Sequence, residues 1–116
     1  MFALTSGMQY FLYRKETDMR NGFDGLCGIV SGAMTRDPLS GDVYVFLNRG
    51  RNRIKILHWE HGGFILYYKR LERGTIDIPP IDETSQSCEI SWSILAMMVE
   101  GISVKNIRKK KRFSLR

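Results

Sequence analysis

The stretch GDVYVFLNRGRNRIKILHWEHGGFILYYKRL, residues 41–71, decides the fold of this chain. It contains three apolar and aromatic runs, at residues 43–48, 54–60 and 64–70, whose successive side chains alternate between two faces. The breaks between the runs, RGRNR and HGG, are short and contain glycine, as the tight connections of antiparallel hairpins do. The sequence therefore predicts a three-stranded antiparallel meander at about residues 43–70.

The first connector of this meander carries more cations than a turn requires. A hairpin turn needs only a glycine or an asparagine, yet four cations surround this one: Arg49, Arg51, Arg53 and Lys55. Arginine matches phosphate oxygens with paired hydrogen bonds, and a two-stranded ribbon can enter or straddle a DNA groove. We predict that this turn contacts DNA. Two alternatives stay open, namely that the cations keep a sheet edge soluble or that they pair with acidic groups on a partner protein.

Other cations would extend this basic surface if folding brings them close to the turn. They stand near the first expected helix and after the third expected strand: Arg14, Lys15, Arg20, Lys69, Arg70 and Arg73. Sequence spacing alone does not show whether these side chains converge on the turn.

The segment before the meander predicts a strand and a helix. Residues 9–15, QYFLYRK, are rich in aromatic side chains and predict a short N-terminal strand. The helix is predicted by an apolar stripe at helical spacing: Phe23, Leu26, Cys27, Val30 and Met34. Asn21 resembles an N-cap, and Asp24 then falls in the first turn. Another face of this helix holds three glycines, which suggests close packing by another backbone or a partner: Gly25, Gly28 and Gly32.

The segment after the meander predicts a second helix at residues 90–102, which begins near Ser91 and stops at Gly101. Residues 75–82 are expected to be extended and residues 83–87 to form a polar linker. Together these elements predict an α+β fold, in which a small antiparallel sheet, made of the meander and the N-terminal strand, packs with two helices.

The positive charge is concentrated at the C-terminus. The formal net charge is +6, from 18 basic and 12 acidic side chains. Seven of the basic residues and none of the acidic ones fall in residues 101–116, so residues 1–100 carry 11 basic and 12 acidic side chains, a net charge of −1. We therefore expect one domain at residues 1–103 and a basic tail at residues 104–116 that contacts a polyanion such as DNA. The densest part of the tail is Arg108, Lys109, Lys110, Lys111 and Arg112. The alternative is a solvated terminus that only aids solubility.

Composition argues against several classes of protein. The 116 residues suffice for one hydrophobic core, and the longest apolar run, residues 94–99, is too short to cross a bilayer. The N-terminus has no basic residue before its apolar part, so we expect no secretory signal, no membrane partner and a cytoplasmic protein. Two distant cysteines, Cys27 and Cys88, are expected to be free thiols, and no ligand spacing predicts a metal or another cofactor.

Catalytic residues are not evident from the sequence. A metal-dependent nuclease needs converging carboxylates, and Glu60 with Lys69 superficially suits one, but the acidic residues mostly fall at helix starts and strand ends: Asp24, Asp42, Glu60, Glu72 and Asp77. His58 is expected to be a hydrogen-bonded core residue and His61 an exposed turn residue. We therefore expect no enzymatic activity.

Four blocks in this order resemble the TnpB accessory proteins of the insertion sequence 66 family of bacterial transposable elements. The blocks are DMRNGFDGL at residues 18–26, DPLSGDVYVF at 37–46, NRGRNRIKILHW at 48–59 and GGFILYYKRLERG at 62–74. The likeness runs from about Tyr10 to Ile102 and leaves the basic tail outside it. It implies a protein encoded beside a separate, larger transposase, which would be its partner.

The resemblance and the charge pattern favour a non-catalytic accessory factor in DNA transposition. Such a factor would bind DNA with little sequence preference through the basic turn and the tail. A protein-interaction adaptor for the transposase, with no DNA contact, is the main alternative, and its surface would be the helix at residues 92–99 or the glycine face. A metal-dependent nuclease is the third hypothesis.

Overall fold

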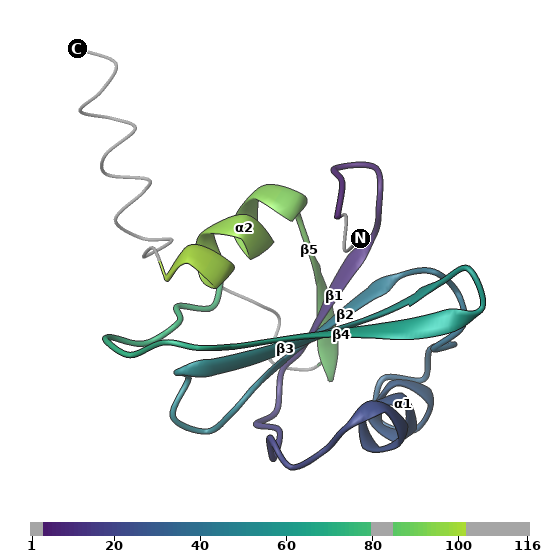
Figure 1. Ribbon diagram of the computed structural model, residues 1–116, viewed down its shortest axis with the longest axis horizontal. Helices are drawn as coiled ribbons and strands as arrows, with labels where there is room; N and C mark the ends of the chain where they lie inside the picture. The colour runs from purple at the N-terminus through teal and green to yellow at the C-terminus, as the bar shows by residue number, and fades with distance from the viewer. Residues whose placement is uncertain (1–3, 80–84, 102–116) are drawn as a thin grey trace.

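The computed structural model describes residues 4–79 and 85–101 (Figure 1). These residues form a five-stranded, mostly antiparallel sheet with strand order β4-β3-β2-β1-β5, together with two helices. In chain order the elements are β1 (Tyr10–Tyr13), α1 (Phe23–Ser31), β2 (Val43–Leu47), β3 (Arg53–Glu60), β4 (Gly63–Arg70), β5 (Ser87–Ile90) and α2 (Trp92–Glu100). The predicted α+β class is confirmed.

The meander forms as predicted, from β2, β3 and β4. In the antiparallel ladder Leu47 lies opposite Ile54, and Glu60 lies opposite Gly63. The second connection is a two-residue turn in which His61 (φ 48°) and Gly62 (φ 84°) both take positive φ values. This is the geometry whose twist matches that of the flanking strands. The expected exposure of His61 is confirmed, since its side chain is 91% exposed.

The N-terminal strand β1 occupies an interior position that the sequence did not predict. It pairs in parallel with β2, with Tyr10 opposite Val43, and the connection between them contains α1. A parallel pair requires such a crossover, because the chain must return to the same end of the sheet. On its other side β1 pairs antiparallel with β5, with Tyr10 opposite Ile90.

The expected boundaries around β5 were wrong. The linker predicted at residues 83–87 includes Ser87 and the helix predicted at residues 90–102 includes Ile90, but both residues belong to β5, and α2 begins at Trp92. A strand of four residues is too short to show a clear alternation in the sequence. Its pairing with β1 defines it instead.

The two helices cover opposite faces of the sheet (Figure 1). On one face α1 packs Leu26 and Val30 against the sheet residues Phe11, Tyr44, Phe46 and Leu57. On the other face α2 packs Leu95 and Met98 against a second group, which includes Leu12, Val45, Ile54 and Ile56. Alternate residues of each strand thus enter different cores, which explains why the strands are apolar on both faces. The two thiols are free, as expected; Cys27 packs in the first core and Cys88 in the second.

The ends of α2 agree with the sequence, whereas the start of α1 does not. The Ser91 side chain accepts a hydrogen bond from the Ile94 N–H, and Gly101 ends α2 with a φ of 75°. In α1 the N-cap is Gly22, which makes no side-chain capping bond, and Asn21 instead donates its side-chain amide to the Asp18 carbonyl. Asn21 is held there because its own carbonyl accepts a hydrogen bond from Lys55.

The close packing expected on the glycine face of α1 is absent among the described residues. A Cβ atom placed on Gly28 would meet nothing within 4 Å, and one on Gly25 would meet only the nearby Asn21 side chain. Gly28 and Gly32 are both exposed. Within residues 4–79 and 85–101, neither helix has the length and apolar character that crossing a bilayer requires.

Candidate nucleic-acid interface

The turn between β2 and β3 is held in one shape by its own side chains. Asn48 Oδ1 accepts hydrogen bonds from the backbone N–H groups of Asn52 and Arg53, at 3.0 and 2.9 Å. Asn48 Nδ2 donates to Asn52 Oδ1 at 2.7 Å. Asparagine commonly makes such bonds to its own following backbone, so two asparagines four residues apart are the sequence signal for this turn. The turn therefore presents its arginines from a fixed backbone.

Arg51 occupies a strained position at the tip of this turn. Its φ is 53°, in the left-handed region where a residue with a Cβ costs roughly 1 kcal/mol more than glycine. The Arg51 N–H donates to the Asn48 carbonyl, and the Arg51 carbonyl accepts from Ile76 N–H at 2.6 Å, so the conformation is fixed on both sides. Glycine or asparagine would fit the backbone better.

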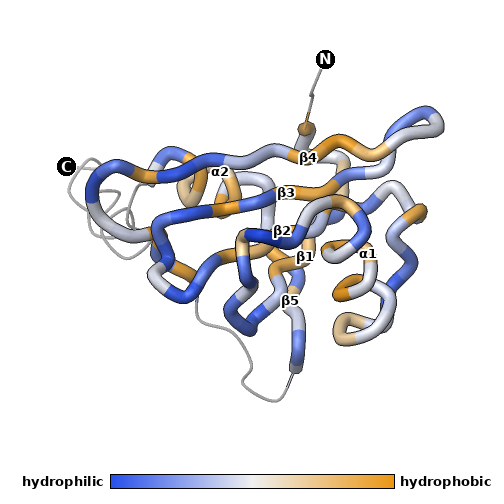
Figure 2. Tube along the Cα trace, turned by 60° about the horizontal axis from the view of Figure 1, so that its bottom comes forward, coloured by the Kyte–Doolittle hydropathy of each residue, from blue (hydrophilic) through white to orange (hydrophobic). Residues whose placement is uncertain are grey.

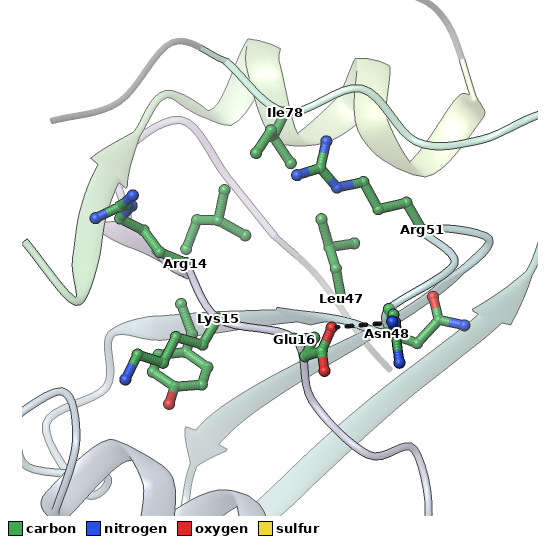
Figure 3. A pocket seen from close by; sticks show the side chains of 10 residues that line it. Arg14, Lys15, Glu16, Leu47, Asn48, Arg51 and Ile78 are labelled. Atoms are coloured by element: carbon green, nitrogen blue, oxygen red, sulfur yellow. Dashed lines mark ion pairs between the residues drawn. The ribbon is translucent and has the colours of Figure 1, made fainter. Parts of the chain in front are cut away.

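A cleft of about 200 Å³ lies between this turn and the segment that follows β1 (Figure 3). Its cationic lining residues come from both sides: Arg14 and Lys15 after β1, and Arg49 and Arg51 in the turn. Because β1 and β2 run parallel, their carboxyl ends meet at the same edge of the sheet, and the residues after each strand become neighbours. Leu12, Leu47 and Ile78 form apolar parts of the wall.

One carboxylate, Glu16, also lines the cleft. Its Oε2 lies 3.9 Å from Arg49 Nε, and the two side chains are 63% and 89% exposed. An ion pair this long and this exposed is weak, so an incoming anion can compete with Glu16 for Arg49. A wider, open region of about 620 Å³ shares Glu16, Asn48 and Arg49 with the cleft and is also lined by Asp18, Gly50 and Arg53.

Arg14 and Arg20 each have a hydrogen-bond partner within the protein. Arg14 is half-buried and donates from Nη1 to the Ser85 carbonyl at 2.7 Å, which ties the end of β1 to the segment before β5. Arg20 does not line the cleft; it binds the Asp18 carboxylate at 2.6 Å. The hydrogen bonds from Arg20 hold the pKa of Asp18 at about 2, so this carboxyl stays ionised and keeps Arg20 paired.

The expectation that Lys55 belongs to the exposed basic turn was wrong. Lys55 is only 6% exposed, and its ammonium donates to the carbonyls of Met19 and Asn21, both at 2.7 Å. It also lies 4.6 Å from the centre of the Tyr68 ring. The reason is strand alternation: Lys55 points to the face that α1 covers, whereas Arg49 and Arg51 precede the strand and stay outside it. The start of β3 is hydrophilic where it leaves the turn (Figure 2).

Arg53, Arg70 and Lys69 do not line the 200 Å³ cleft, although Arg53 borders the open region beside it. Arg53 donates to the Tyr68 hydroxyl at 2.9 Å and lies opposite Arg70 in the ladder. Arg70 in turn pairs with Glu72 at 2.8 Å. Lys69 points to the other face, where it donates to the Val99 carbonyl at the end of α2. The predicted tail residues Arg108, Lys109, Lys110, Lys111 and Arg112 fall outside the described part of the chain.

Catalytic groups do not converge within residues 4–79 and 85–101. Glu60 and Lys69 lie at opposite ends of the β3–β4 ladder, with Glu60 opposite Gly63 and Lys69 opposite Ile54. No group of three or more metal-ligating side chains occurs in these residues. His58 is buried, as expected, but its Nδ1 has no hydrogen-bond partner among the described residues.

Comparisons with known proteins identify relatives over most of the chain. A family described as IS66 Orf2 like protein matches residues 8–109. The uncharacterized protein y4jC of Sinorhizobium fredii (strain NBRC 101917 / NGR234) is 27% identical over 110 residues, which cover 95% of this chain and 92% of the relative. The uncharacterized protein y4hO of the same strain is 33% identical over 86 residues, covering 74% and 73%. No solved structure matches the chain.

Proposed function

We propose, from the premise that this chain belongs to the IS66 Orf2-like family, that it is a non-catalytic accessory protein of transposition that binds DNA at the cleft beside the β2–β3 turn. The family associates the chain with the transposition of a bacterial insertion sequence. DNA binding is the additional step, and the cleft supports it. Binding there would be directed at the phosphate backbone, so it would depend little on base sequence.

The observation that carries this proposal is a set of four cations that two distant segments contribute to one cleft. Arg14 and Lys15 follow β1, whereas Arg49 and Arg51 belong to the turn after β2, and all four line one cleft (Figure 3). Like charges repel one another, and the one carboxylate of the cleft, Glu16, offsets this repulsion only in part, so gathering four cations costs stability unless a further anion is bound. The left-handed conformation of Arg51 adds a second cost at the same place. Both costs are explained if the cleft holds a phosphate of DNA.

The basic tail would add affinity on the same electrostatic principle. Its sequence contributes seven cations and no acid to residues 101–116. Cations near a bound duplex release condensed counterions from DNA, which makes binding salt-dependent whatever the base sequence. Tail and cleft are therefore separable in an experiment, because substituting one leaves the charge of the other in place.

The test is a fluorescence-anisotropy titration of the full chain with duplex DNA at a low and a high salt concentration. Arg51→Gly is the informative variant, because glycine suits a positive φ and the domain should be as stable as the parent or more so. We expect it to bind DNA about tenfold more weakly and to lower the salt slope by about 1, as the loss of one phosphate contact does. Thermal unfolding would confirm that the fold is kept.

Matched variants make this test specific to the cleft. Arg36→Gln removes one positive charge from an exposed arginine on the α1 side and should change affinity little. Glu16→Gln removes the competing carboxylate and should raise affinity by about two- to fivefold. Replacing residues 108–112 by glutamine measures how much of the DNA affinity the tail contributes. If Arg51→Gly and Arg49→Ala both bind DNA as the parent does at both salt concentrations, the cleft is not a DNA site.

A second candidate function is an adaptor that binds the larger transposase of the same element. The observation that favours it is a mostly apolar groove of about 190 Å³ beside α2, lined in part by Tyr67, Trp92 and Val99. Trp92 is 42% exposed, which is unusual for so large an apolar side chain. A Trp92→Ala variant should then lose binding of the purified transposase and keep its affinity for DNA. If Trp92→Ala binds the transposase as tightly as the parent chain does, this groove is not the adaptor surface.

A further inference from the structure

The outer side of β4 offers backbone hydrogen-bonding groups that no described strand uses. β4 is the last strand on its side of the sheet, and part of it is apolar (Figure 2). The ladder identifies these groups, because the Leu71 N–H donates to the Asn52 carbonyl at 2.7 Å. From Leu71 backwards, successive residues direct their backbone N–H and C=O groups alternately toward β3 and away from it. Leu71 and every second residue before it therefore face β3. The residues whose backbone N–H and C=O point outward are Phe64, Leu66, Tyr68 and Arg70.

This edge lacks the features that usually prevent strands from pairing. β4 has eight residues, GFILYYKR, without a proline, and its register with β3 is continuous from one end to the other. Its charges are confined to its last two residues, and Lys69 turns away from the edge to bind the Val99 carbonyl. A long apolar edge of this kind is a template for another strand.

We propose that β4 pairs antiparallel with β4 of a second copy of this chain, so that two sheets become one. The outward-pointing residues of one copy must face those of the other to exchange hydrogen bonds. The register that uses all of them places Phe64 opposite Arg70 and Leu66 opposite Tyr68, with Tyr67 opposite its counterpart on the twofold axis. Such a contact is self-complementary, and it closes as a dimer.

The charges along β4 identify a second copy, in this orientation, as the occupant. Cations stand at one end of the strand, whereas the other end carries the Phe64 ring, which packs edge-on to Trp59 with 4.9 Å between the ring centres. Antiparallel pairing sets the Arg70 guanidinium of each copy beside the aromatic pair of the other, a favourable cation–π arrangement. The ion pair of Arg70 with Glu72 is exposed on both sides and therefore too weak to cancel this attraction. Parallel pairing would instead set Lys69 and Arg70 against their own counterparts. The proposal does not depend on DNA binding, because the edge and the cleft are different surfaces.

The first test compares two substitutions at the same residue by analytical ultracentrifugation of the full chain over a range of concentrations. Phe64→Lys and Phe64→Glu remove the same ring from Trp59, but only lysine is repelled by Arg70 of the second copy. We expect the lysine variant to dissociate about tenfold more readily than the glutamate variant, since two like-charge contacts form per dimer. Equal dissociation constants, or a parent chain that stays monomeric throughout the micromolar range, would overturn the proposal.

The second test checks the register by disulfide trapping and does not require the interface to be weakened. In the proposed dimer the Cα atoms of Tyr67 and its counterpart form a close, non-hydrogen-bonded pair about 4.5 Å apart, within reach of a disulfide. Tyr67→Cys should therefore give a crosslinked dimer on non-reducing electrophoresis. Ile65→Cys, which retains the same native cysteines and would lie opposite Lys69, should not. Crosslinking of both variants to the same extent, or of neither, would contradict this register.

Discussion

At the scale of single residues, Lys55 and Arg51 show how neighbouring cations take different roles. Both look alike in the sequence, because each adds a positive charge next to a glycine-containing turn. In the structure Lys55 lies inside, where its ammonium holds the carbonyls of Met19 and Asn21 and so fixes the segment before α1 against the sheet. Arg51 lies outside and lines the cleft, and its positive φ is a backbone conformation that residues other than glycine disfavour. One cation stabilises the fold, and we propose that the other binds DNA.

Replacing Lys55 by methionine should destabilise the protein by about 2–3 kcal/mol, because it keeps the apolar stem but leaves two carbonyls without their donor. Urea denaturation followed by tryptophan fluorescence would measure the change. Arg49→Met is the matched control: Arg49 is 89% exposed, so the same replacement should change stability by less than about 0.5 kcal/mol. Equal stability of the two variants would show that the Lys55 hydrogen bonds contribute nothing.

At the scale of elements, α1 is a weak helix that the sheet stabilises. It has nine residues, an N-cap glycine without a side-chain capping bond, and two further glycines in its interior. Isolated helices of this length are marginal even with better helix formers. Its stability comes from Leu26 and Val30, which are fully buried against the sheet, and from the segment that Lys55 secures before it. The open space beside Gly28 shows that no described residue requires a glycine there.

Gly28→Ala should therefore stabilise the protein by about 0.5–1 kcal/mol, since alanine costs less conformational entropy in a helix and its methyl group meets no neighbour. The midpoint of thermal or urea unfolding would show the gain. Gly25→Ala is the comparison, because its methyl group would collide with the Asn21 side chain and should give a smaller gain or a loss. A Gly28→Ala variant that is more stable but fails to bind the transposase would revive the glycine face as a partner surface.

At the scale of the whole molecule, the parallel pairing of β1 with β2 sets the architecture. It requires the crossover through α1, which leaves α2 to cover the opposite face (Figure 1). The sheet therefore divides the interior into two cores, each with a buried tyrosine that is hydrogen-bonded to a backbone carbonyl: Tyr10 to Thr5, and Tyr44 to Asp37. The same pairing brings the cationic ends of β1 and β2 together at one edge.

Stability should fall at alkaline pH, because both cores contain acidic groups that burial keeps neutral. Burial raises the pKa of the Cys27 and Cys88 thiols above 9.0 and the pKa of Tyr10 and Tyr44 above 10.0. In the unfolded chain these groups ionise at their ordinary pKa values, before they do so in the folded protein. The free energy of unfolding is therefore unaffected by them below about pH 9 and falls as the pH rises above it. Urea midpoints between about pH 7 and about pH 11 should decline over the upper part of this range, and Tyr44→Phe should decline less steeply. A flat profile would contradict this coupling.

Much of the fold could be predicted because its signals are local. The alternation of side chains in residues 43–70, the glycine-containing connectors and the caps Ser91 and Gly101 each lie within one short segment, and the structure confirms them. β5 was missed because four residues carry too little pattern and depend on β1 for their pairing. The N-cap of α1 was misassigned because Lys55, remote in sequence, holds Asn21 in place.

The sequence by itself determined the meander, the two helices and the basic turn, since hydrophobic periodicity and turn chemistry act between near neighbours in the chain. Only the tertiary structure decided that β1 lies beside β2, that Arg14 and Lys15 share a cleft with Arg49 and Arg51, and that Lys55 points inward. The physical reason is that the first two features depend on the pairing of strands separated by the whole α1 crossover, and the third depends on the segment around α1 that covers one face of β3. The direction and register of such a pairing follow from packing both cores at once, which no short pattern records.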